Sequence, residues 1–167
     1  MHRNGLIYRD LKIENILCDG NDAVRLTDFG FSGMASSSKE FWLPCYSRYY
    51  AAPEIVSMKR YSFPVDLWAL GTMTFILLLG YAPFGNDLNA RCIFSLELDE
   101  EESAKISAAA KDFIEKLMRM SPVERMGLDK ACSHHWLAKE SYSYYTGLSQ
   151  EEVTVLRTLL NEYMKKF

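Results

Sequence analysis

The chain has 167 residues, 49% of them hydrophobic and 25% charged, with a formal net charge of -3. This length suits one domain with its own core, and the composition is that of an ordinary soluble globular protein. The weak negative charge gives no electrostatic argument for nucleic acid or an anionic membrane as a partner. Four cysteines without paired spacing indicate a reducing, intracellular setting, with the cytoplasm as the default.

The chain is expected to begin inside a helix. Residues 1–5 predict the last turn of that helix, ended by Asn4-Gly5, and Leu6-Ile7 then form a short apolar step. The next eight residues are Tyr8-Arg9-Asp10-Leu11-Lys12-Ile13-Glu14-Asn15. An acid, a base and an amide lie close together in this stretch, which makes it the chemical centre of the chain.

A β-hairpin is predicted directly after this stretch, from Ile16 to Thr27. An apolar run, the turn residues 19–22 and an alternating run follow one another, as a hairpin requires. Asp28-Phe29-Gly30 comes next. The hairpin therefore brings Asp28 close to Asn15, which sequence separation alone would not ensure.

Four polar side chains in these two stretches match the needs of phosphoryl transfer. Because moving a phosphoryl group needs little covalent help, a protein orients the attacking hydroxyl and neutralises charge, largely through Mg²⁺. Asp10 can accept the hydrogen bond of the hydroxyl, and Lys12 can meet the phosphate charge. Asn15 and Asp28 offer the hard oxygen ligands that Mg²⁺ prefers. One such residue alone is ordinary turn chemistry, but the four in this order favour phosphotransfer.

With these motifs the chain resembles the eukaryotic-type serine/threonine protein kinases, and within them the calcium/calmodulin-dependent group. The match is to the catalytic loop His-Arg-Asp-Leu-Lys-x-x-Asn, with Tyr8 in place of the histidine, and to the Asp-Phe-Gly motif. A lysine at the position of Lys12 is typical of the serine/threonine branch. The resemblance implies Asp10 and Lys12 as catalytic residues and transfer of the ATP γ-phosphate to protein serine or threonine.

ATP and Mg²⁺ are the cofactors that the resemblance implies. Lys12, Asn15 and Asp28 would contact the nucleotide and its metal ions, with Asn15 and Asp28 as the metal ligands. Leu17 would lie under the adenine ring, although a core leucine of the hairpin is equally compatible with this residue. Phe29 and Gly30 complete the Asp-Phe-Gly motif as structural residues.

A long loop is predicted from Phe31 to Ala51, where the composition turns to serine, glycine and aromatic residues. It resembles the activation segment of the kinases, closed by Ala52-Pro53-Glu54. The resemblance places Ser47 against the catalytic aspartate. The position that many relatives phosphorylate falls on Leu43, which cannot carry phosphate.

Leu43 bears on the role of Arg9. In many relatives a phosphate on the loop pairs with the arginine of the catalytic loop, and Leu43 offers no acceptor for that phosphate. The serines at 36–38 are an alternative place for it, but a flexible polar loop is the simpler interpretation of them. The regulation of this segment is therefore left open.

A buried helix is predicted from Val65 to Leu79, preceded by Pro64 and ended by Gly80. It is apolar nearly all round, but too short and too interrupted for a membrane span. In the resemblance it is the central helix of the large lobe, and Asp66 braces the catalytic loop. A carboxylate favoured by the helix dipole is a second explanation of Asp66, compatible with the first. We expect part of this helix to lack cover, and the chain to be poorly soluble.

Beyond this helix, the polar and acidic residues 86–105 predict a solvated loop and helix face. Ser107 is predicted to cap a further helix. The apolar face of that helix consists of Phe113, Ile114, Leu117 and Met118. In the resemblance, Arg125 is the arginine that pairs with Glu54 in a structural ion pair.

The last part of the chain begins at His134-His135-Trp136-Leu137, which resembles the closing His-x-Trp of the kinase domain. Cys132 beside these histidines suggests a metal, but no second ligand pair accompanies them, and ordinary packing is favoured over a zinc site. Residues 149–152 form a capping-box pattern before an amphipathic helix that runs to Phe167. This helix is expected to pack against the lobe, with binding of a regulatory partner as the alternative.

The sequence therefore predicts the large, C-terminal lobe of the protein kinase fold at residues 1–137 and an extension at 138–167. This lobe is expected to be mainly α-helical with one small β-hairpin, and the N-terminal lobe, with its glycine-rich loop and strand lysine, to be absent. We expect a serine/threonine kinase with a truncated catalytic domain that alone binds Mg-ATP weakly or not at all. An inactive docking or scaffold module and a gene remnant are the alternatives.

Overall fold

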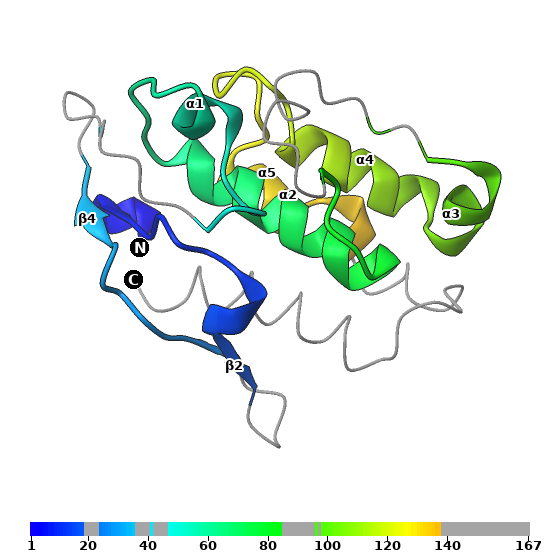
Figure 1. Ribbon diagram of the computed structural model, residues 1–167, viewed down its shortest axis with the longest axis horizontal. Helices are drawn as coiled ribbons and strands as arrows, with labels where there is room; N and C mark the ends of the chain where they lie inside the picture. The colour runs from blue at the N-terminus through cyan, green and yellow to red at the C-terminus, as the bar shows by residue number, and fades with distance from the viewer. Residues whose placement is uncertain (19–23, 36–40, 42–46, 85–95, 97, 138–167) are drawn as a thin grey trace.

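The computed structural model describes residues 1–18, 24–35, 41, 47–84, 96 and 98–137 (Figure 1). Within these residues, helices form the main body and short strands lie along one side of it. The α-helices are α1 (Pro53–Val56), α2 (Pro64–Leu79), α3 (Glu100–Lys105), α4 (Ala108–Leu117) and α5 (Leu128–Cys132). The 3₁₀ helices are η1 (His2–Asn4), η2 (Ile13–Asn15) and η4 (His135–Leu137), and the strands are β1 (Leu6–Ile7), β2 (Ile16–Cys18), β3 (Val24–Leu26) and β4 (Gly33–Met34).

The strands form two antiparallel pairs in the described part of the chain. β2 pairs with β3, with Leu17 opposite Arg25, so the predicted hairpin is confirmed, although its turn lies outside the described residues. β1 pairs with β4, with Ile7 opposite Gly33. This second pair corrects the prediction of a single hairpin. Two-residue strands carry no periodic signal, and β4 lies in a stretch whose composition is that of a loop.

The N-terminal turn is a 3₁₀ helix, and it ends where the sequence predicts. Gly5 follows η1 with φ 73°, in the left-handed region that glycine adopts without steric cost. The backbone N–H of Gly5 donates to the carbonyl of His2 at 2.9 Å, which closes the turn. The chain then enters β1 and leads directly into the predicted catalytic loop.

Helix α2 is the centre of the fold, as its composition predicts. Every residue from Val65 to Phe75 is buried, whereas residues 76–79 are partly exposed, so any loss of cover is confined to the last turn of the helix. Gly71 lets α4 approach closely, because a Cβ at this position would lie 2.6 Å from Cγ of Met118 and 2.9 Å from Cβ of Leu117. Fully burying side chains such as Leu117 stabilises the fold by about 1.5 to 3 kcal/mol each.

Helix α4 packs its apolar side onto α2 and is capped as predicted. The side chain of Ser107 accepts a hydrogen bond from the backbone N–H of Ala110 at 2.9 Å. Phe113 and Ile114 are fully buried against the core. The preceding α3 begins with a capping box made by Asp99 and Glu102.

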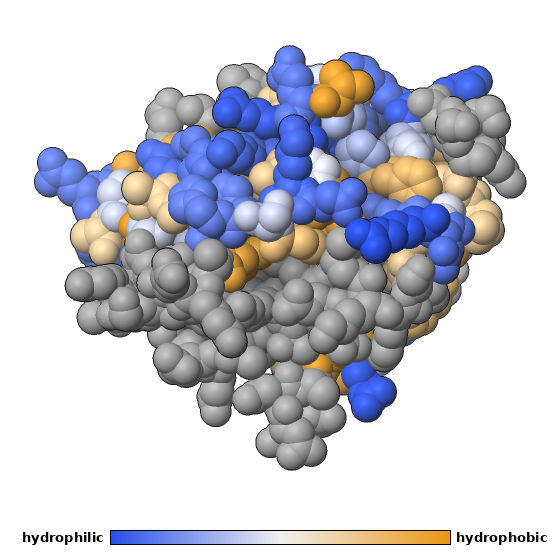
Figure 2. Space-filling model, turned by 180° about the vertical axis from the view of Figure 1, so that it is seen from behind, coloured by the Kyte–Doolittle hydropathy of each residue, from blue (hydrophilic) through white to orange (hydrophobic). Residues whose placement is uncertain are grey.

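Several exposed apolar side chains lie on or near the strands, the two most exposed, Val123 and Met58, lie elsewhere, and none of those in the described residues lies on α2. Leu17 is 55% exposed, Phe29 47%, Phe31 44% and Met34 60%. On the face seen in Figure 2, the described surface is largely hydrophilic, with hydrophobic side chains in small groups. Across the described residues, no helix combines the length and apolar character that crossing a membrane requires. The serines at 36–38, Leu43 and the predicted helix beyond residue 149 lie outside the described residues.

Candidate active site

The predicted catalytic loop runs from β1 to η2, and its backbone is hydrogen-bonded to the side chain of Asp66 of α2. The carboxylate of Asp66 is 2% exposed. Its Oδ2 accepts a hydrogen bond from the backbone N–H of Tyr8 at 2.9 Å, and its Oδ1 accepts one from the N–H of Arg9 at 2.8 Å. Arg9 has φ 70°, a conformation that costs a non-glycine residue energy and needs such support. Asp66 therefore fixes the backbone that leads to Asp10.

The carboxylate of Asp10 is buried and receives three hydrogen bonds. Its Oδ2 accepts from Nζ of Lys12 at 2.7 Å and from Nδ2 of Asn15 at 3.0 Å. Its Oδ1 accepts from the hydroxyl of Ser47 at 2.7 Å. A carboxylate has about four lone-pair positions, so Asp10 retains room for roughly one further donor. A substrate hydroxyl could take that position without displacing the groups that orient the carboxylate.

Ser47 connects the activation segment to the catalytic loop. Besides bonding Asp10, its hydroxyl oxygen accepts a hydrogen bond from Nζ of Lys12 at 3.0 Å. The three side chains thus form a closed triangle in which the Lys12 ammonium balances the buried Asp10 carboxylate. The structure places these three residues together, although Ser47 lies 37 positions from Asp10 in the chain.

Asn15 and Asp28, the two predicted metal ligands, are connected through Thr27. The backbone N–H of Thr27 donates to the carbonyl of Asn15 at 2.9 Å. The nitrogen of the Asn15 side chain donates to the backbone oxygen and the carboxylate of Asp10, and the side chain also bonds Tyr8 in a way that lowers the phenol pKa, as a donor does. The amide oxygen is then the atom that could bind a ligand. Asp28 is exposed, and its Oδ1 accepts from the N–H of Gly30 at 3.1 Å. These oxygens suit a hard cation such as Mg²⁺.

Tyr8 occupies the place of the usual histidine and acts here as a packing residue. Its hydroxyl donates to the backbone carbonyl of Thr27, and its ring meets Phe29 edge to face at 5.4 Å. Burial is the largest cause that raises the pKa of Tyr8 to about 12. The phenol therefore remains protonated at physiological pH, which suits a structural link between the catalytic loop and the Asp-Phe-Gly turn.

Leu17 lies on β2 with its side chain exposed to solvent. Its exposed fraction of 55% rules out the interpretation of Leu17 as a core residue of the hairpin. An exposed leucine on a strand next to Asn15 offers an apolar surface beside the polar site. Contact with adenine remains the prediction for this side chain.

Glu54 and Arg125 form a buried bidentate ion pair. Nη1 of Arg125 lies 2.8 Å from Oε1 of Glu54, and Nη2 lies 3.0 Å from Oε2. Arg125 also donates to the backbone carbonyls of Pro64 and Arg119. The pair therefore joins the end of the activation segment to the start of α2.

Two contacts of the predicted site were not anticipated from the sequence. The hydroxyl of Tyr50 donates to Oε2 of Glu14 at 3.2 Å, and burial is the largest cause that raises the pKa of Tyr50 to about 12. The guanidinium of Arg9 lies over the ring of Phe41, 4.3 Å from its centroid. No local pattern marks Phe41 or Tyr50, because both contacts depend on the folded path of the activation segment.

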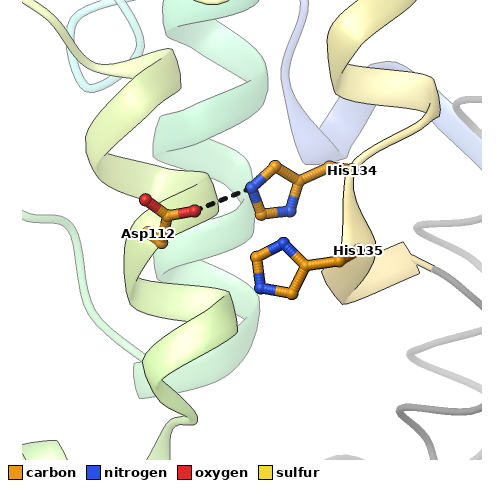
Figure 3. Close-up of side chains that lie close together, drawn as sticks. All are labelled: Asp112, His134 and His135. Atoms are coloured by element: carbon orange, nitrogen blue, oxygen red, sulfur yellow. Dashed lines mark hydrogen bonds and ion pairs between the residues drawn. The ribbon is translucent and has the colours of Figure 1, made fainter.

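Asp112 of α4 lies beside His134 and His135 in a compact polar cluster (Figure 3). One ligand atom from each of the three residues lies within 4.8 Å of the others. Nε2 of His134 lies 2.9 Å from Oδ2 of Asp112, and the backbone N–H of Trp136 donates to Nδ1 of His134 at 3.3 Å. An imidazole that accepts at Nδ1 carries its proton on Nε2 and donates from there.

This hydrogen-bond pattern favours packing over metal binding at His134. A metal ion on Nε2 would have to displace the proton that binds Asp112, and Nδ1 would then lose the Trp136 bond or the ring would become an imidazolate. Cys132 is the residue whose position beside the histidines suggested a metal. It is half-buried, and burial is the largest cause that raises the pKa of its thiol. A thiol that resists ionisation is a poor metal ligand.

Comparison with known proteins identifies the class to which this fold and loop belong. Residues 1–137 match the family model of the protein kinase domain. The matched region covers most of the chain, including every predicted site residue. The chain therefore belongs to the protein kinase family.

Several relatives are similar over most of the chain. A probable myosin light chain kinase of Dictyostelium discoideum is 41% identical over 148 residues, which are 83% of this chain and 38% of that protein. A probable serine/threonine-protein kinase, the KIN1 homolog of Encephalitozoon cuniculi, is 34% identical over 97% of this chain and 29% of its own length. The cGMP-dependent protein kinase 2 of Rattus norvegicus is 36% identical over 82% of this chain and 19% of its own length. The chain thus spans well under half of each of these relatives.

Proposed function

We propose that this chain holds the residues of a serine/threonine protein kinase site that bind the phosphate-accepting substrate and the metal ions. The kinase would be of the calcium/calmodulin-dependent type. The observation that carries this proposal is the triangle of Asp10, Lys12 and Ser47. A buried carboxylate held by a cation and a hydroxyl, with one position left for a donor, suits orientation of an attacking alcohol. The substrate class would be protein serine or threonine.

Each residue of the site has a role in this proposal. Asp10 accepts the hydrogen bond of the substrate hydroxyl and takes its proton, while Lys12 lies where it can balance charge on the transferred phosphoryl group. Asn15 and Asp28 would hold Mg²⁺ through their free oxygens. The metal ion, when bound, neutralises charge that develops on the phosphate oxygens.

ATP would lie against Leu17 with its phosphates toward Asp28. Because Leu17 is 55% exposed, the described residues cover an adenine ring from one side only, and we expect low affinity for Mg-ATP. A non-catalytic docking module is the second candidate function. It is favoured by the exposed apolar side chains of Leu17, Phe31 and Met34, which offer a surface that a binding partner could cover.

Phosphate transfer to a basic serine peptide by the purified 167-residue chain tests the two functions. If the site is catalytic, Asp10→Asn should lower the rate of transfer by roughly 10²- to 10⁴-fold, which is the contribution of a general base. Asp129→Asn is the matched control, because Asp129 is exposed and pairs only with the exposed Arg3 among the described contacts. Transfer that Asp10→Asn leaves unchanged would show a contaminating kinase and remove the support for a catalytic site.

Mn²⁺ binding gives a second measurement that does not require turnover. The paramagnetic ion should broaden the NMR signals of residues around Asn15, and Asp28→Asn should weaken this effect, since it removes a charged oxygen ligand. Metal binding without transfer would favour the docking module over the enzyme. Absence of both would contradict the proposed metal site as well.

A further inference from the structure

The side chain of Arg9 has contacts that the proposed chemistry does not use. Its Nε donates to the backbone carbonyl of Phe31, and its guanidinium lies 4.3 Å from the ring centroid of Phe41. In the part of the chain that the structure describes, no carboxylate lies within ion-pair distance of this guanidinium. An aromatic face therefore meets the cation, an interaction that planar guanidinium groups favour.

Phe41 is fixed from a second direction by Tyr61. The backbone N–H of Phe41 donates to the carbonyl of Tyr61 at 2.9 Å, and the N–H of Tyr61 donates back at 2.8 Å. The two rings stack with their centroids 5.9 Å apart and an interplanar angle of 26°. Tyr61 is 3% exposed, so Phe41 is attached to the core and not to a surface loop.

Gly33 provides the space that the ring of Phe41 occupies. A Cβ at position 33 would lie 2.7 Å from Cζ of Phe41, 2.9 Å from its Cε1 and 3.3 Å from Nη2 of Arg9. Real Cβ atoms do not approach ring atoms this closely, so any other residue would push the ring away. Gly33 also pairs with Ile7 of β1, two positions before Arg9. The β1–β4 pair therefore lies beside both Phe41 and Arg9, the two partners of the ring–guanidinium contact.

We propose that Phe41 is a positioning residue of the proposed kinase site. Its ring holds the Arg9 guanidinium and thereby the backbone that carries Asp10, so that the activation segment docks without a phosphate. Kinase activation loops are commonly ordered by a phosphate that pairs with arginine. Here the uncharged ring lies on the face of the guanidinium, and the Nε edge that could bond a phosphate oxygen donates instead to the backbone carbonyl of Phe31. The catalytic role of Asp10 rests on the proposed function, but the docking of Phe41 can be tested independently.

Amide hydrogen exchange of the 167-residue chain tests this docking, with the N–H of Tyr61 as the probe. Phe41→Leu removes the aromatic face but keeps an apolar side chain, and it should raise the exchange rate of the Tyr61 amide by roughly 5- to 30-fold. Phosphatase treatment of the wild-type chain should leave this rate unchanged. Phe31→Leu is the control, since Phe31 is 44% exposed and contacts Arg9 through its backbone.

A double variant separates the ring–guanidinium contact from independent packing. Arg9→Met should raise the exchange rate about as much as Phe41→Leu, and the two together should raise it no further. If the double variant instead raises the exchange rate by the product of the two single effects, the two residues act separately and the proposal is overturned. A rise in exchange after phosphatase treatment of the wild type would also overturn it, because a phosphate would then be the docking element.

The amide of Ala110 in α4 reports whether each variant is folded, since its N–H donates to the capping side chain of Ser107. If Phe41→Leu loses this protection as well, Gly33→Ala provides the test, because it displaces the ring without removing it. No arm of the experiment requires ATP, metal or peptide. Failure of the phosphotransfer assay would therefore leave this result intact, and the reverse also holds.

Discussion

Arg125 and Glu54 meet through two parallel hydrogen bonds of 2.8 and 3.0 Å across 71 positions of sequence. Both side chains are at most 5% exposed, so neither charge has water to stabilise it alone. Removing one partner of a buried pair typically costs about 3 to 5 kcal/mol, because the other charge is left uncompensated. The pair is thus a sensitive test of whether the activation segment and α2 are joined as described.

Arg125→Met should lower the free energy of unfolding by about 3 to 5 kcal/mol, measured by urea denaturation. Glu54→Leu combined with Arg125→Met should recover part of this loss, since no charge then remains buried. Lys105→Met is the control, because its partner Glu101 is 82% exposed and water screens the pair, so that its loss should change stability little. Equal losses for Arg125→Met and Lys105→Met would contradict a buried pair.

Gly71→Ala tests the close approach of α2 and α4. The new Cβ would lie 2.6 Å from Cγ of Met118, so the helices must separate or the methionine must move. Overpacking of this kind costs typically about 1 to 3 kcal/mol, and a thermal melt should show the loss. Gly127→Ala should lower the melting temperature less, because nothing lies within 4 Å of its Cβ and only the preference of the N-cap of α5 for glycine over alanine is lost. A neutral Gly71→Ala would mean that the helices pack less closely.

His134 should make the stability of the fold depend on pH. Burial is the largest cause that lowers the pKa of His134 below the usual histidine value of 6.5, while the hydrogen bond to Asp112 opposes it. The unfolded chain therefore binds more protons than the folded chain, and stability rises with pH. The contribution of His134 is fully present above the unfolded pKa of 6.5 and is lost as pH falls through the lower folded pKa.

Urea denaturation between pH 5 and pH 7.5 measures this dependence. The free energy of unfolding should fall as the solution is acidified through the region below pH 6.5, and His134→Gln should reduce this slope. Asp112→Asn should make the loss larger and extend it to lower pH, because the folded-state pKa of His134 falls further while the unfolded pKa stays the same. His135→Gln should reduce the slope less than His134→Gln, because the charge of the exposed His135 is only a smaller cause of the lowered pKa of His134. The same slope in wild type and His134→Gln would contradict a buried histidine at this position.

Local signals predicted the parts of the fold that depend on neighbours in sequence. Composition and flanking residues predicted α2, and the cap at Ser107 predicted the start of α4. Turn residues predicted the β2–β3 hairpin. Each of these signals arises within one element, so the sequence contains it directly. The catalytic loop was likewise recognisable, because Asp10, Lys12 and Asn15 lie within six consecutive positions.

The remaining contacts depend on residues that only folding brings together. β4 has two residues and takes its strand conformation from its pairing with β1. Phe41 is attached by a single bridge to Tyr61, which no local periodicity reveals. At the C-terminal histidines, the sequence suggested Cys132 as a partner because it is near in the chain. The contact of His134 is instead with Asp112, 22 positions away.

Glu14 and Tyr50 predict how substrate charge affects the proposed activity. Glu14 is exposed beside the catalytic loop, and its carboxylate is oriented by the buried hydroxyl of Tyr50. An arginine of the substrate near this carboxylate would form a solvent-exposed ion pair, worth about 0.2 to 1 kcal/mol. Glu14→Gln should therefore reduce the preference for an arginine-containing peptide over its alanine counterpart by roughly 1.5- to 5-fold in kcat/KM.

Tyr50→Phe should have a smaller effect in the same direction, since it removes the orienting hydrogen bond but keeps the charge of Glu14. The neutral peptide should be phosphorylated equally by all three proteins, because Glu14 does not contact the reacting groups. Glu124→Gln is the matched control, as Glu124 is exposed on the described surface and belongs to no part of the proposed site. If Glu124→Gln lowers the preference as much as Glu14→Gln, the effect comes from net charge and Glu14 does not select the substrate.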